Sequence, residues 1–169
     1  MLVTFSHDPR GESYTRLTRV DGVVLGLPSV SRKFRVPHDL AHFAVERALS
    51  LPGGLFGCIA AGAVFPNMTL LSGRPRHNAR SRSATVLRSA RSSLALAESL
   101  VGTVHSMAEA GRPLSLPLLR EAWGVLRPPP CPYGESDLHS ISADLASVLA
   151  EWDAQDSLEL RWPERLRAA

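Results

Sequence analysis

The stretch "SYTRLTRVDGVVLGL", residues 13–27, decides the fold class predicted for this chain. Asp21-Gly22 is a dipeptide typical of tight β-hairpin turns, and it lies between two segments rich in β-branched and aliphatic residues. We therefore predict two antiparallel strands, at 13–20 and 23–27, joined by a short turn.

Two further strands are expected at the ends of the sequence. "MLVTFSH", residues 1–7, and "SLELRW", residues 157–162, both alternate in side-chain character, as half-buried strands do. We expect both to join the hairpin, so that the two ends of the chain meet in one small antiparallel sheet.

The rest of the sequence favours helices. Helical spacing of apolar residues and long runs without proline predict five of them, at about 37–50, within 54–65, at 79–110, at about 115–126 and at 135–153. The apolar stripe of the last helix is expected to pack on the long helix at 79–110. Residues 67–78 are expected to form a loop, and the proline-rich residues 127–134 an internal connector. The predicted fold class is α+β, a single domain over 1–169 with a small antiparallel sheet packed on four or five helices.

Composition bounds the function. The chain has 169 residues, 44% hydrophobic and 21% charged, with a formal charge of +3, which is typical of a globular domain and argues against general disorder. It has neither a secretory signal pattern nor an apolar run of the about 18 residues that a membrane-spanning helix needs. We expect a cytoplasmic protein without a membrane span, in which Cys58 and Cys131 remain thiols.

The segment "VPHDLAHFAVERAL", residues 36–49, carries the candidate functional residues. His38 and His42 lie one helical turn apart, a spacing that lets two imidazoles reach one zinc ion, as in the H-E-x-x-H helix of metalloproteases. Asp39 takes the position of the glutamate and is the candidate catalytic base. Its side chain is one methylene shorter, so its reach to a metal-bound water would differ, and it could instead ligate the metal itself. Glu46 is the candidate third metal ligand. Four other side chains could also converge on the site through the fold: Cys58, His77, His105 and His139.

An alternative interpretation needs no metal. The two histidines share a helix stripe with Val45 and Leu49, so they could be structural residues that satisfy ordinary hydrogen bonds in the core. Asp39 would then complement the positive N-terminus of the helix. Both interpretations remain open at this point.

The same segment resembles two known families. H-D-x-x-H is similar to the metal-binding signature of the ubiquinone-biosynthesis scaffold and decarboxylation family, which would imply a zinc site facing a prenyl-quinone-like ligand. That signature has a glutamate twelve residues after the second histidine, where this chain has Gly54, and the family is all-helical. Over most of its length the chain resembles an uncharacterised bacterial family of small proteins with a "PHDLxHFxVE" helix, a "GLFGxxAAG" stretch and a C-terminal "SLELRWP" strand. This second likeness supports the fold division and implies no activity.

Six arginines and no acidic residue lie between Arg74 and Arg91. Such a segment could bind phosphates, or could be a solvated face. No nucleic-acid-binding motif accompanies it, so nucleic acid is not an expected partner. Motifs of serine hydrolases and nucleotide-binding loops are also absent from the sequence.

Two functional classes therefore follow from the sequence. The first is a zinc-binding protein with a hydrolase-like activity; the second is a non-catalytic interaction or scaffold protein whose histidines are structural. The partner, whether a small molecule or a protein, and the oligomeric state are not specified by the sequence.

Overall fold

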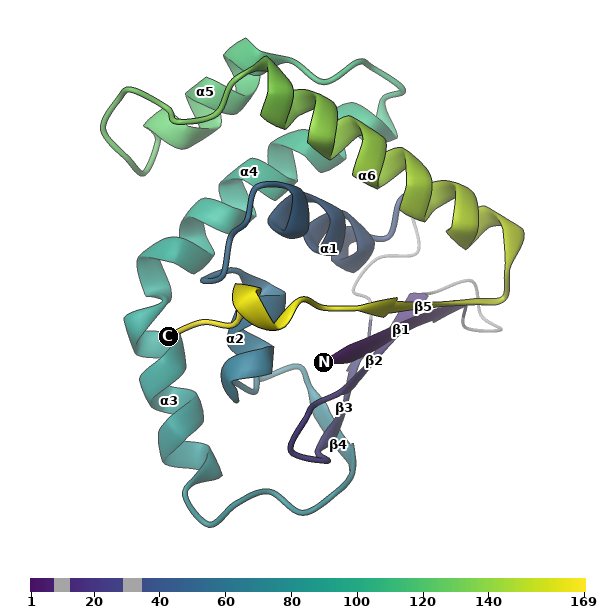
Figure 1. Cartoon of the computed structure of the whole chain (residues 1–169), viewed down its shortest axis with the longest axis vertical. Coiled ribbons are helices and arrows are strands. Elements are labelled where there is room, and N and C mark those ends of the chain that lie inside the picture. Colours follow the sequence, from purple (N-terminus) through teal and green to yellow (C-terminus); the bar gives the residue numbers. More distant parts are fainter. Residues whose placement is uncertain (8–12, 29–34) are drawn as a thin grey trace.

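A five-stranded antiparallel sheet, in the order β4-β3-β2-β1-β5, forms one layer of the protein in a computed structural model that describes residues 1–7, 13–28 and 35–169 (Figure 1). Its strands are β1 (Leu2–His7), β2 (Ser13–Thr18), β3 (Val24–Pro28), β4 (Thr69–Ser72) and β5 (Ser157–Arg161). The first and last strands pair with each other, as predicted. The α+β fold class is thereby confirmed.

The predicted hairpin turn determines the register of the central strands. Gly22 has a φ of 80°, which favours glycine, and its N–H donates to the carbonyl of Arg19 at 3.1 Å. The register then pairs Leu17 with Val3 on one side and with Leu25 on the other. Because side chains alternate along a strand, these residues share one face, and all three are buried beneath the helices.

The helices lie mainly to one side of the sheet (Figure 1). They are α1 (His38–Ala48), α2 (Leu55–Ala61), α3 (Ala79–Ser89), α4 (Arg91–Glu109), α5 (Leu116–Gly124) and α6 (Glu135–Ala154), followed by the short 3-10 helix η1 (Glu164–Leu166). Helix α1 is central, because it packs against both α4 and α6.

Aromatic rings connect α1 to the sheet and to the C-terminal segment. The ring of Phe43 makes edge contacts with Phe5, Phe56 and Trp162 at centroid distances of 5.9, 5.3 and 5.4 Å. Aromatic pairs of this kind stabilise the fold beyond the effect of burying apolar surface. The contacts of Phe43 hold the histidine-bearing helix in one orientation.

Three predictions about the helical layer and its loops were wrong. Residues 67–78 are not entirely loop, because Thr69–Ser72 form the edge strand β4. All four residues of β4 are exposed, so its sequence lacks the alternation of apolar and polar side chains that predicts a half-buried strand. The helix predicted at 79–110 is two helices that meet at Ala90, where ψ is 0°. Neither glycine nor proline marks this break. The apolar stripe of α6 packs on α1 instead of on the predicted long helix.

Among the residues that the structure describes, no helix is both long and apolar enough to cross a membrane.

Candidate metal centre

Helix α1 brings the two predicted histidines together. The rings of His38 and His42 meet edge to face with centroids 4.8 Å apart, as expected for residues one turn apart. Helix α4, which packs against α1, contributes Glu98 and His105 to the same region. The site is therefore built between two helices that are distant in the sequence.

Carboxylates lie on both sides of His42. Its Nδ1 is 2.8 Å from Oε1 of Glu46, and its Nε2 is 3.4 Å from Oε1 of Glu98. The imidazole is buried, and so is Glu46, whereas the side chain of Glu98 is 59% exposed. The ring therefore has one buried carboxylate behind it and one at the protein surface in front of it.

Glu46 also caps α2. Its Oε1 accepts a hydrogen bond from the backbone N–H of Leu55 at 2.7 Å, and its Oε2 accepts one from that of Phe56 at 3.1 Å. These N–H groups belong to the first turn of α2, where a helix has no internal acceptors and favours negative charge. The buried carboxylate is thus satisfied by three donors.

Gly54 makes this arrangement possible. A Cβ at this position would lie 2.3 Å from Cδ of Glu46, well inside van der Waals contact. Gly54 occupies the position at which the ubiquinone-biosynthesis signature has its glutamate. The carboxylate of Glu46 fills the space that a side chain at position 54 would take.

The charges around the histidines differ sharply. Burial alone would lower the pKa of His42, but its hydrogen bonds to Glu46 and Glu98 raise that pKa to about 10. Burial, followed by the charges of His42 and His105, lowers the pKa of His38 to about 4. The hydrogen bond from His42 lowers the pKa of Glu98. At neutral pH the site holds one charged imidazole, one neutral imidazole and an ionised carboxylate.

Three side chains could hold a metal ion. Ligand atoms from His38, His42 and Glu98 all lie within 4.8 Å of one another, the one such group among the residues the structure describes. Zinc bonds of about 2.0–2.1 Å in a tetrahedron place ligand atoms roughly 3.3 Å apart. The distance of 3.4 Å between His42 and Glu98 already matches this value. Other ligand atoms of the group are up to 4.8 Å apart, so they would have to approach one another by as much as about 1.5 Å to surround an ion.

One member of the group, Glu98, lies at the protein surface, with its side chain 59% exposed. Glu98 also lines a shallow groove of about 490 Å³, together with residues of α4 and Leu118 of α5; neither histidine lines this groove. A metal held by the three residues would face the surface on the side of Glu98.

Asp39 and Glu46, the other two residues singled out in the sequence, lie outside this group of three. Oδ2 of Asp39 accepts a hydrogen bond from Oγ1 of Thr15 on β2 at 3.1 Å, and burial raises the pKa of Asp39 to about 6. Asp39 therefore contacts the sheet, while Glu46 stands behind His42.

The other candidate side chains are also outside the group. His105 lies with its ring 5.0 Å from that of His38, and its Nε2 is 2.8 Å from the carbonyl oxygen of Val36. The thiol of Cys58 is buried, which raises its pKa to about 12, and donates weakly to the carbonyl of Gly53. His77 and His139 are exposed, and neither belongs to the group of three.

Glu98 was missed in the sequence. Its distinguishing feature is that it is the only acidic residue between Glu46 and Glu109. Identifying it as a ligand requires knowing that α4 packs on α1, which local periodicity does not specify.

Comparison with protein-family models, with curated proteins and with solved structures gave no match. The geometry of the site is therefore the evidence for a function.

Proposed function

We propose that this protein binds a divalent metal ion, with zinc the best candidate, through His38, His42 and Glu98. Two imidazoles and one carboxylate form a ligand set that zinc uses in catalytic sites, where a fourth position stays open. Glu98, the exposed member of the group, would keep such a position open toward the surface. His38 is neutral at physiological pH and so has a lone pair available for a metal. His42 is charged in the metal-free protein, so metal binding would have to displace the proton on its Nε2.

The contact between His42 and Glu46 carries the proposal. Metal-binding histidines usually donate their second ring N–H to a carboxylate, which fixes the tautomer and directs the other nitrogen at the metal. Here Nδ1 of His42 meets a fully buried carboxylate, so Nε2 faces Glu98 and the side of His38. We assign to Glu46 the role of orienting His42, in place of the ligand role suggested by the sequence.

We extend the proposal to a hydrolase-like activity. Zinc bound with an open position lowers the pKa of a bound water to about 7 and polarises substrate carbonyls. Asp39 is the candidate base, because a carboxyl whose pKa is about 6 exchanges protons near neutral pH. Its present hydrogen bond to Thr15 would have to open for it to act.

A second function is favoured by the raised pKa of His42, which keeps its imidazole charged at neutral pH. His42 already forms a charge-compensated cluster with Glu46 and Glu98, which satisfies a buried imidazolium without a metal. In that case the protein is a non-catalytic scaffold or interaction protein, and the cluster serves to join α1, α2 and α4.

Zinc titration of the purified full chain distinguishes the two functions. After treatment with a chelator and dialysis, the wild-type protein should bind about one zinc per chain, measured by calorimetry and by elemental analysis. His38→Ala and Glu98→Gln should each weaken binding at least about tenfold, because each removes a ligand. His139→Ala is the matched control, since His139 is exposed and its ring contacts only a carbonyl of its own helix.

Wild-type protein that binds no zinc, or zinc binding that is unchanged in both ligand variants, would contradict the metal function. The scaffold function instead predicts that Glu98→Gln lowers the free energy of unfolding while no stoichiometric metal is found.

A further inference from the structure

Four arginines from three parts of the chain line a cleft that contains no residue of the metal group. The cleft has a volume of about 290 Å³ and is lined by Arg19, Arg76, Arg82 and Arg167. Asp21 is the one acidic residue in its lining. Two of these arginines belong to the arginine-rich segment between Arg74 and Arg91. The cleft therefore has a net positive charge.

Arg19, which lines this cleft, has one donor without a partner. The residue is only 7% exposed, and its Nε and Nη2 donate to Oδ1 and Oδ2 of Asp21 at 3.1 and 2.6 Å. Its Nη1 is buried and has no hydrogen-bond partner among the described residues. Leaving a buried charged donor unpaired is unfavourable. An anion in the cleft would supply an acceptor if the guanidinium turned Nη1 toward it.

Arg82 is positioned at the same cleft by the end of α2. Its Nε donates to the carbonyl of Ala61 at 2.8 Å. The next residue, Gly62, has a φ of +115°, and a Cβ there would lie 2.9 Å from Nε of Arg82. The positive φ favours glycine at this position, and a Cβ there would also displace the guanidinium of Arg82.

An apolar cleft adjoins the arginines. It has a volume of about 420 Å³, shares Arg19 and Gly62 with the cationic cleft, and is lined mainly by aliphatic side chains of β3, β4 and α3. Leu25, Leu70 and Leu87 are among them, and Leu70 on the edge strand is 52% exposed. Apolar surface left open beside a group of polar residues is typical of ligand sites.

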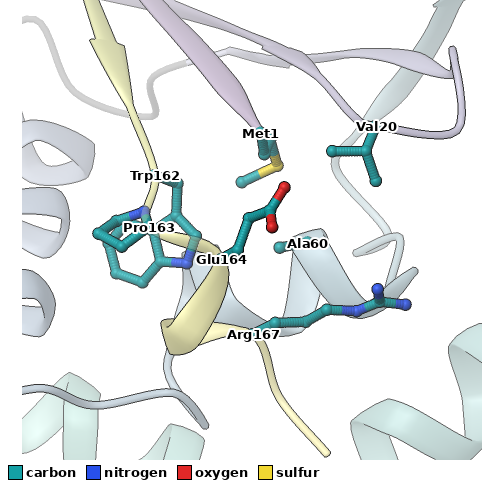
Figure 2. Close-up of a pocket in the computed structure, with 7 residues that line it drawn as sticks. All are labelled: Met1, Val20, Ala60, Trp162, Pro163, Glu164 and Arg167. Carbon is teal, nitrogen blue, oxygen red and sulfur yellow. The ribbon is translucent and has the colours of Figure 1, made fainter.

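A third cleft, of about 230 Å³, adjoins the arginines on another side (Figure 2). Figure 2 shows Arg167 reaching past Ala60, and Glu164 pointing its carboxylate toward Met1. The acidic Glu164 makes this direction unfavourable for an anion. The apolar cleft is the better continuation of the cationic one.

We propose that the two adjoining clefts bind an anionic amphiphile, with a phosphate monoester on Arg19, Arg76, Arg82 and Arg167 and an alkyl chain against Leu25, Leu70 and Leu87. A phosphate monoester near neutral pH has a charge of about −2 and several acceptor oxygens, which suit guanidinium donors. The two clefts have no residue in common with the metal group, so the ligand site and the metal site are tested independently.

The test is calorimetric titration of the full chain with octyl phosphate, below its micelle concentration, and with ethyl phosphate and inorganic phosphate. Octyl phosphate should bind at least about tenfold more tightly than inorganic phosphate, since burial of its methylene groups favours binding. Arg76→Ala/Arg167→Ala should weaken its binding at least about tenfold; both arginines are exposed, so the fold should be retained. Arg88→Ala/Arg91→Ala removes two exposed arginines outside the cleft and should change binding less than about twofold.

Leu70→Ser should reduce the advantage of octyl over ethyl phosphate and leave the affinity for ethyl phosphate unchanged. Inorganic phosphate binding as tightly as octyl phosphate would overturn the assignment of the apolar cleft. Equal losses in both double-arginine variants, together with tight binding of single-stranded DNA, would show a diffuse polyanion surface and overturn the proposal.

Discussion

Replacing Glu46 by glutamine tests the part of the structure on which the metal centre depends. The carboxylate accepts hydrogen bonds from His42, Leu55 and Phe56 in a fully buried position. An isosteric amide has one acceptor oxygen and one NH₂ group, so at least one of these donors would face another donor. Breaking a buried charged pair by removing one partner costs about 3–5 kcal/mol. We expect Glu46→Gln to lower the free energy of unfolding by about 3 kcal/mol.

The assay is urea denaturation followed by circular dichroism at pH 7, in the presence of a chelator so that metal binding does not contribute. Glu121→Gln is the control, because Glu121 is exposed on α5, and its effect should stay within about 0.5 kcal/mol. In zinc titrations Glu46→Gln should also weaken binding about 10–100-fold, as expected when a carboxylate behind a metal-binding histidine is lost. If Glu46→Gln lowered the free energy of unfolding by less than about 1 kcal/mol, the hydrogen bonds of Glu46 would not be what holds α1 and α2 together.

Three further predictions concern the same region in metal-free protein. The folded state raises the pKa of His42 to about 10. The difference in free energy of unfolding between wild type and His42→Gln should therefore be largest below about pH 6.5 and shrink as the pH rises toward 10. A difference that does not depend on pH in urea titrations would contradict this. Burial raises the pKa of Asp39 to about 6, so the wild-type protein should lose stability as the pH rises from about 4 through 6. Asp39→Asn should be about 2 kcal/mol more stable than wild type at pH 8 but not at pH 4. Equal melting temperatures of the two proteins at pH 8 would contradict this prediction. Gly54→Ala should cost about 1–3 kcal/mol in thermal unfolding because its Cβ meets Glu46, whereas Gly102→Ala, which meets nothing within 4 Å in the middle of α4, should be neutral or stabilising.

Local sequence patterns were sufficient for the features that depend on neighbouring residues. The dipeptide Asp21-Gly22 predicted the central hairpin, because its backbone preference does not depend on the rest of the fold. The spacing of His38 and His42 predicted that their rings meet, because a helical turn places them on one face.

Features that depend on tertiary contacts could not be predicted from local sequence patterns. Strand β4 is exposed along its length and forms only because β3 offers an edge, and the break at Ala90 has no helix-breaking residue to mark it. Glu98 reaches His42 only because α4 packs on α1. The same limit applies to the arginine cleft, which joins segments from both ends and the middle of the chain.

X-ray absorption at the zinc edge of the zinc-loaded protein identifies the ligands of the metal. We expect two imidazole ligands with Zn–N distances of about 2.0–2.1 Å, oxygen ligation from a carboxylate, and no sulfur. The imidazole count should fall to one in His38→Ala. A Zn–S distance of about 2.3 Å, or a shell of oxygen atoms without imidazole, would contradict a metal centre formed by His38, His42 and Glu98.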